Sequence, residues 1–299
     1  MYARRVRPWL LVIVSLSACG ATPHEIDRAV VRQIPGGGRH AQLWAQARAA
    51  WAHRDDEAAL REAIADWRAA VDIRDDDHEA YAMLAQAYFF LADGFLVFDD
   101  QHKDELVDAF EQGLGYADRG LRALSPAYEA RRRDGQTADE AIAAPALGLD
   151  RDAAPFLYWY AQNLLRWAHA RGTFTLMKIY KIANRAMDAA DKLDPDYYCG
   201  GPDRYFAAFL AGAPGMAGGD VQAAKARFDA SLRRAPAFFE THMLLADVYA
   251  VKTKDKALYV SSLRYVLDTP VDVIPDMVPE QATAKRKAKR LLERADERF

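Results

Sequence analysis

The chain has 299 residues, 51% of them hydrophobic, and a formal net charge of −3 from 40 basic and 43 acidic residues. This balance argues against nucleic acid as the partner, because phosphate binding requires a basic surface. The length is sufficient to bury a large core, either in one domain or in an array of small units.

The N-terminus has the pattern of a bacterial lipoprotein signal. Three arginines precede a short apolar run over residues 9–16, which is too short to span a bilayer, and no similar run is expected later in the chain. The next residues, Leu16-Ser17-Ala18-Cys19, fit a lipobox, in which the cysteine becomes the lipidated first residue of the mature protein. We therefore predict a signal peptide over residues 1–19 and a protein that is anchored to a membrane without spanning it. The alternative is an ordinary secretory signal with a chance cysteine.

The residues after Cys19 predict where the protein is held. Gly20 stands in the position where an aspartate would favour the inner membrane, so the pattern indicates an outer-membrane anchor that faces the periplasm. Residues 20–39 end in the breaker Pro35-Gly36-Gly37-Gly38 and predict a tether. The folded domain is expected over residues 40–299.

Apolar residues recur at three- and four-residue spacing through this domain, which predicts an all-α fold. Several segments also fit the tetratricopeptide template, a helix–turn–helix unit with the pattern W-x2-L-G-x2-Y, A-x3-F and P. We predict about four degenerate helix pairs and a C-terminal capping helix; the alternative is one helical domain that mimics the pattern. The matching residues are Tyr81-x2-Leu84-Ala85-x2-Tyr88, Ala183-x3-Met187 with Pro195, Ala224-x3-Phe228 with Pro236, and His242-x2-Leu245-Ala246-x2-Tyr249.

Two segments between the repeats are expected to be irregular: Ser125 to Pro155, and Thr269 to Pro279. Pro279 and Glu280 suit the first turn of the capping helix. The basic run in that helix is predicted to be its solvated face, with contact to anionic lipid headgroups as the alternative. This run consists of Lys285, Arg286, Lys287, Lys289 and Arg290.

The stretch YYCGGPDRYF, residues 197–206, is predicted to be a corner between two repeats. Asp220 further on is a predicted N-cap for a helix that runs to Arg234. Cys199 fits a small buried residue near this corner; a nucleophile or an intermolecular disulfide is the alternative, although no histidine lies in a local signature. The glycine pair in the corner lacks the pattern of a phosphate-binding loop.

No catalytic motif is found. His78-Glu79 begins an H-E-x-x-H pattern, but Ala82 stands in place of the second histidine. The acidic cluster of Asp99, Asp100, His102, Asp104, Glu105 and Asp108 lacks the spacing of an EF-hand and fits a solvated helix start. We therefore expect no enzyme, no metal and no cofactor.

A binding groove is the remaining candidate site. The first helix of each pair lines the concave face of a tetratricopeptide array, and aromatic side chains beside an arginine and an asparagine could hold a carboxylate or a peptide end. The alternative is that residues 156–160 are simply core. The projected groove residues are Glu79, Gln86, Phe156, Trp159, Asn163, Arg166, Trp167, Asp203, Phe206, Glu240 and Asp247.

The segments FLYWYAQNLLRWA, from residue 156, and YYCGGPDRYFAAFLAGAPGMAGGD, from residue 197, place the chain near a known family. In their order and spacing they resemble the T-component lipoproteins associated with TRAP transporters, often called TatT. The resemblance runs from about Leu43 to the end of the chain and is strongest over residues 156–251.

The resemblance implies an all-helical fold with cryptic tetratricopeptide repeats. It also implies a periplasmic solute-binding protein of a TRAP-type transporter as partner, self-association, and a cavity for hydrophobic or carboxylated small ligands. The chain is thus expected to be a lipid-anchored periplasmic scaffold. One alternative is a tetratricopeptide adaptor in outer-membrane protein assembly, and another is an enzyme that depends on Cys199.

Overall fold

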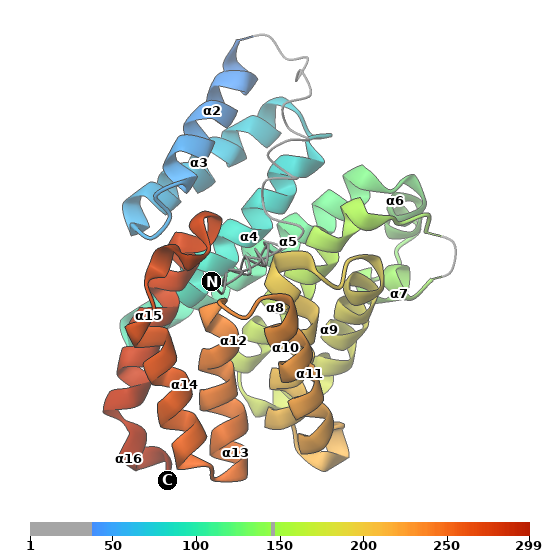
Figure 1. Cartoon of the computed structure of the whole chain (residues 1–299). Helices are drawn as coiled ribbons and strands as arrows, with labels where there is room; N and C mark the ends of the chain where they lie inside the picture. Colours follow the sequence, from blue (N-terminus) through green and yellow to red (C-terminus); the bar gives the residue numbers. More distant parts are fainter. Residues whose placement is uncertain (1–37, 145–146) are drawn as a thin grey trace, which may run out of the picture.

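The computed structural model describes residues 38–144 and 147–299, which form helices and turns with no strand among them (Figure 1). The all-α prediction is confirmed. The predicted signal peptide, Cys19, nearly all of the tether and Pro145 lie outside the described residues, so the domain boundary at residue 40 stays a prediction.

Most helices of the described chain form five hairpins, in which successive helices pack on each other. The prediction of about four pairs was one short, because the first hairpin, residues 39–73, contains none of the segments that fit the template. The hairpins are α2 (Arg39–Trp51) with α3 (Glu57–Ile73), α4 (His78–Gly94) with α5 (Lys103–Leu124), α8 (Ala154–Ala170) with α9 (Thr173–Leu193), α10 (Tyr197–Gly212) with α11 (Val221–Arg234), and the α12–α13 segment (Phe239–Leu244, Val251–Thr253) with α14 (Lys256–Asp268).

Shorter elements connect and close the array. A π-helical turn, Leu245–Ala250, joins α12 to α13, and 3-10 turns cover Leu96–Phe98, Asp100–His102, Arg151–Ala153, Gly215–Ala217, Val271–Val273 and Pro275–Met277. The last helices are α15 (Val278–Glu293) and α16 (Ala295–Arg298). Pro279 lies in the first turn of α15, as predicted.

Aspartates start several of the helices. Asp56, Asp220 and Asp255 each accept a hydrogen bond from a backbone N–H in the first turn that follows, which is the usual N-cap arrangement. The predicted cap of α11 by Asp220 is therefore confirmed. Asp77 caps α4 and also lies 2.8 Å from His40 Nε2 and 2.7 Å from Trp44 Nε1, so this single carboxylate ties α2 to α4.

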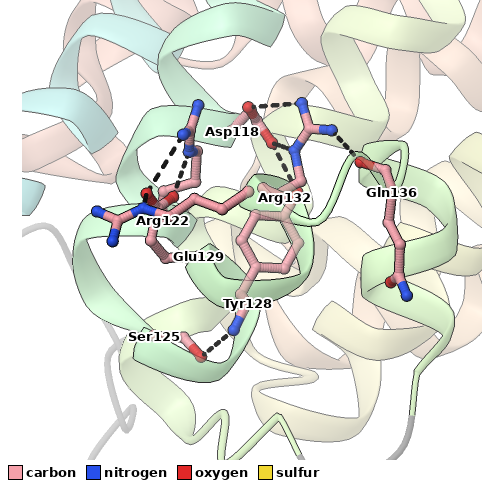
Figure 2. Close-up of polar contacts among 8 residues, drawn as sticks. Asp118, Arg122, Ser125, Tyr128, Glu129, Arg132 and Gln136 are labelled. Atoms are coloured by element: carbon pink, nitrogen blue, oxygen red, sulfur yellow. Dashed lines mark hydrogen bonds and ion pairs between the residues drawn. The ribbon is translucent and has the colours of Figure 1, made fainter.

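The segment from Ser125 to Pro155, predicted to be irregular, contains two ordered helices, α6 (Pro126–Arg133) and α7 (Ala138–Ala143). Polar contacts to α5 explain the difference (Figure 2). The hydroxyl of Tyr128 donates to Asp118 at 2.7 Å, and the guanidinium of Arg132 donates to both oxygens of the same carboxylate at 2.9 and 3.1 Å. Helix α6 is thus held against α5, because the Asp118 carboxylate of α5 binds both Tyr128 and Arg132.

Residues 78–98 are long and apolar enough to cross a bilayer, contrary to the expectation that no such run follows the leader. In the structure most of this stretch is buried within the protein. Its apolar character is that of a core helix, because α4 packs against α3, α5 and α8.

Helices α5 and α8 approach closely at two glycines. A Cβ on Gly120 would lie 2.1 Å from a ring carbon of Phe156, and one on Gly113 would lie 2.5 Å from the amide oxygen of Asn163. Neither glycine has a positive φ, so glycine is required at these positions because a Cβ atom would collide with α8. The side chains of α8 fill the gap that the missing Cβ atoms leave.

We predict that Gly120→Ala lowers the free energy of unfolding by roughly 1–3 kcal/mol, because the ring of Phe156 must shift in a packed core. Urea denaturation measures this. Gly115→Ala is the matched control on the same helix, where nothing lies within 4 Å of the added Cβ. The control is expected to be neutral or up to about 1 kcal/mol more stable. Equal effects of both substitutions would contradict the close approach of α8.

Candidate functional site

The corner in YYCGGPDRYF is a left-handed turn. Tyr198, Cys199 and Gly200 have φ values of 50°, 57° and 67°, and the helical backbone resumes at Gly201. For residues other than glycine, this conformation costs roughly 1–2 kcal/mol each. Two consecutive non-glycine residues here mean that the surrounding structure must stabilise the turn.

Arg204 supplies that stabilisation. Its guanidinium donates to the carbonyl oxygens of Cys199 and Tyr198, both at 3.1 Å, and to the hydroxyl of Tyr158 at 3.2 Å. It also lies over the ring of Phe238, 4.6 Å from its centroid. The side chain is only 1% exposed. The arginine thus satisfies carbonyl groups that a left-handed turn leaves without helical partners.

The rest of the corner is core, as predicted. Cys199 is 2% exposed and belongs to the main hydrophobic cluster, and a Cβ on Gly201 would lie 2.6 Å from the ring of Tyr158. A nucleophile needs access to its substrate, so burial argues against a catalytic role for this thiol.

The turn directs Tyr198 toward a buried ion pair. The Tyr198 hydroxyl donates to Glu280 Oε1 at 3.2 Å, and Arg54 donates to both carboxylate oxygens of Glu280, at 3.0 and 2.7 Å. Burial, followed by the charges of Glu280 and Glu240, raises the pKa of Tyr198 well above its ordinary value. The phenol therefore stays a hydrogen-bond donor across the physiological range.

A second buried carboxylate, Asp93 at the end of α4, pairs with Arg166 of α8 and Lys287 of α15. Burial alone would raise the pKa of Asp93, but Lys287 and Arg166 together lower it to about 2. The prediction that the basic run of α15 is solvated is therefore wrong for Lys285, Arg286 and Lys287, which are partly buried. Arg286 donates to the carbonyl of Gly94, Arg290 lies 4.2 Å from the ring centroid of Phe98, and Lys285 donates to the carbonyl of Leu267.

A small pocket of about 30 Å³ lies between these groups, where α4, α10, α12 and α15 meet. A volume of this size holds about one water molecule. Glu240, on its wall, has a carboxylate oxygen 3.8 Å from Nε of Arg204, beyond hydrogen-bond distance. The lining residues are Phe89, Phe90, Asp93, Gly94, Tyr198, Glu240, Met243, Glu280, Thr283, Ala284 and Lys287.

Five of the predicted groove residues are buried and present no groove wall. The side chain of Asn163 donates to the carbonyls of Ala85 and Trp159, and Asp203 accepts from Arg227 at 2.6 Å and Arg234 at 3.0 Å. Residues 156–160 of α8 are all buried, as the alternative interpretation expected. The buried five are Gln86, Phe156, Trp159, Asn163 and Asp203.

The other six stay partly exposed, and only two of them lie at the pocket. Glu240 lines it directly, and Arg166 is bound to the Asp93 that lines it. Arg166 is therefore already neutralised by a carboxylate of the same chain. The remaining four lie elsewhere: Glu79 at the start of α4, Trp167 beneath Arg171, Phe206 beneath Arg227, and Asp247 paired with Arg298.

Sequence reasoning missed most of the buried polar site. Arg54 stands in the turn after α2, Arg204 and Tyr198 belong to the corner, and Lys287 was assigned to a wet helix face. One signal was present, because Asp203 and Arg204 are the only charged residues in the sequence from 197 to 219. A buried charge of this kind requires polar partners.

The acidic cluster at residues 99–108 supports a capping role. Asp99 caps the 3-10 turn Asp100–His102, where it accepts a hydrogen bond from the backbone N–H of Gln101 at 2.9 Å, and Asp104 and Glu105 lie in the first turn of α5, which follows. Within residues 38–144 and 147–299, no group of three or more metal-ligating side chains is close enough to hold an ion.

With this geometry in place, comparison with known proteins identifies the family. The family model described as TRAP transporter T-component (TAtT) matches residues 75–299. The chain belongs to the TRAP transporter T-component family. This confirms the resemblance seen in the sequence, and it associates the chain with a TRAP transporter of the bacterial cell envelope. The family is one of transporter components. Comparison with curated protein sequences finds no match to this chain.

We predict that Lys287→Met moves the loss of stability in acid to higher pH. A lowered pKa in the folded state means that Asp93 stabilises the protein above about pH 4, near its unfolded pKa, and that this contribution is lost as the pH falls toward about 2. Without Lys287 the pKa of Asp93 rises, so the loss begins earlier on acidification. Urea unfolding at a series of pH values measures the shift.

At neutral pH the same substitution is expected to cost roughly 1–3 kcal/mol. This is less than the roughly 3–5 kcal/mol for breaking a fully buried pair, because Arg166 still faces Asp93. Asp93→Asn, alone and combined with Lys287→Met, is the control, since without the titrating carboxylate the loss of Lys287 should no longer move the acid limb. An unchanged acid limb in Lys287→Met would show that the lysine does not set the titration.

Proposed function

We propose that this chain is a lipid-anchored periplasmic scaffold that docks the solute-binding protein of a TRAP-type transporter. The observation that carries the proposal is the family match over residues 75–299. The helical hairpins support it, because stacked hairpins provide extended surfaces for other proteins. We also propose that these hairpins are degenerate repeats of the tetratricopeptide type.

The docking surface that we propose surrounds the pocket between α4, α12 and α15. Glu240 and Arg166 are partly exposed there, with side-chain exposures of 28% and 37%. The charges behind them are fixed by Asp93, Glu280 and their partners, so a partner would meet a preorganised pattern of charge. Preorganisation lowers the entropic cost of association.

The proposal includes a small hydrophobic or carboxylated ligand at the same place. Arg204 is a buried cation whose nearest carboxylate, Glu240, is 3.8 Å away and partly exposed. A ligand carboxylate that displaced Glu240 would meet this guanidinium in a dry environment, where charge-assisted hydrogen bonds are strong. Since the pocket holds only about one water molecule, entry of a ligand requires α12 and α15 to separate.

We predict that a photo-crosslinking amino acid at position 240 captures a solute-binding protein in the periplasm. The same probe at Asp134, in the exposed turn after α6, is the matched control and is expected to capture none. Mass spectrometry of the adducts identifies the captured protein.

The outcomes separate the two classes of scaffold. Adducts with outer-membrane barrel-assembly components in place of a solute-binding protein would favour the adaptor role. Equal yields at positions 240 and 134 would contradict the proposed docking surface, while leaving the family assignment intact.

The anchor is tested separately. We predict that Cys19→Ser releases the protein from the outer-membrane fraction, because no acyl chain is attached to serine by this pathway. Density-gradient fractionation of the cell envelope measures the distribution. Retention of the variant with signal-peptide cleavage intact would mean that another feature binds the membrane. Ala18→Ser, beside the attachment site, is a control expected to remain anchored.

A further inference from the structure

An apolar surface extends over the first half of α9 and the turn between α10 and α11. No residue from 171 to 182 is fully buried, although this stretch is rich in apolar side chains. Phe174 is 75% exposed, Met177 39% and Met216, in the neighbouring turn, 90%. Tyr180 of α9 stacks on Phe209 of α10 with ring centroids 5.6 Å apart, which joins the two parts.

Helical spacing places cations on the same outward stripe of α9. Lys178 and Lys181 follow Phe174 at four and seven residues, so they share its face. The ammonium of Lys178 lies 4.2 Å from the ring centroid of Phe174, and the guanidinium of Arg171 lies 5.0 Å from that of Trp167. Among the described residues, none of these three cations forms an ion pair.

Carboxylates are absent from both parts of the surface. Residues 171–187 and 204–219 contain no aspartate or glutamate, in a chain with 43 acidic residues. The acids that border them are already engaged, because Asp188 pairs with Lys192, Asp220 caps α11, and Asp139 of α7 binds Arg185. The surface therefore combines exposed aromatic and aliphatic groups with unneutralised positive charge.

We propose that this surface docks on a lipid bilayer that carries anionic headgroups. Phe174 and Met216 enter the boundary between headgroups and acyl chains, while Lys178, Lys181 and Arg171 contact the anionic headgroups around them. Aromatic and apolar side chains flanked by lysine and arginine are the combination found in helices that lie at membrane interfaces. The proposal does not depend on the docking of a solute-binding protein.

Charge and extent favour lipid over the other occupants. A second copy that docked through the same face would bring the lysines of the two copies together. A standard protein interface buries roughly 800 Å² per partner, whereas the strongly exposed apolar groups here are Phe174, Met177 and Met216. A few inserted side chains with surrounding cations are sufficient for a membrane contact that supplements an anchor.

The experiment uses the full chain with its own leader, purified in detergent and reconstituted into phosphatidylcholine vesicles with or without phosphatidylglycerol. Met216→Cys carries an environment-sensitive fluorophore, and Asp134→Cys is the control position. Cys199 is 2% exposed and does not compete for the label. We expect a blue shift and quenching by brominated lipids at position 216, only with phosphatidylglycerol, and neither change at position 134.

Charge variants make the test quantitative. Replacing Lys178 and Lys181 by glutamine is expected to lower the equilibrium constant for insertion of this surface into the bilayer about fivefold for each lysine. Lys103→Gln with Lys252→Gln removes the same charge from exposed positions elsewhere and is expected to change little. Phe174→Ser is expected to abolish insertion, whereas Ile73→Ser, at another exposed apolar position, is not.

Three results would overturn the proposal. A blue shift of equal size in neutral vesicles would show that headgroup charge is not recognised. A shift in detergent that grows with protein concentration would assign the surface to a second copy. Shielding of the fluorophore at position 216 from solvent only after addition of a solute-binding protein would assign the surface to that protein.

Discussion

The carboxylate of Glu280 joins three parts of the chain that are far apart in the sequence. Arg54 binds it from the turn between α2 and α3, and Tyr198 binds it from the corner before α10. Because Glu280 lies in the first turn of α15, the last long helix is fixed against both the first and the fourth hairpin (Figure 1). An open stack of hairpins would leave these surfaces in water; here the capping helix closes the array onto its own beginning.

Closing the array with buried ion pairs costs desolvation free energy. Ion pairs in a protein interior often contribute little net stability compared with well-packed apolar groups, but loss of one partner is strongly destabilising. Glu280 with Arg54, and Asp93 with Arg166 and Lys287, therefore specify the position of α15 more than they strengthen the fold. The left-handed turn at Tyr198 belongs to the same arrangement, since it presents the phenol to Glu280 at the cost of backbone strain.

Local features were predictable from the sequence, and contacts between distant segments were not. The cap of α11 by Asp220, the proline in the first turn of α15 and the corner at Cys199 each depend on neighbouring residues, and the structure shows all three. Helix α6 and the contacts of the basic run in α15 depend on partners in α5 and α4. Asn163 and Phe156, which the groove projection placed on the wall, are buried instead and fill the space beside Gly113 and Gly120 of α5.

Closure of the array constrains how this scaffold meets other molecules. With Asp93, Glu240, Glu280 and their cations engaged inside the chain, the pocket among them accommodates water unless the helices around it separate. The unneutralised cations on α9 lie on a different surface, beside exposed apolar groups, and no such rearrangement is needed to reach them. Contact with a flat anionic surface at α9 would therefore leave the surface around the pocket available to a second partner.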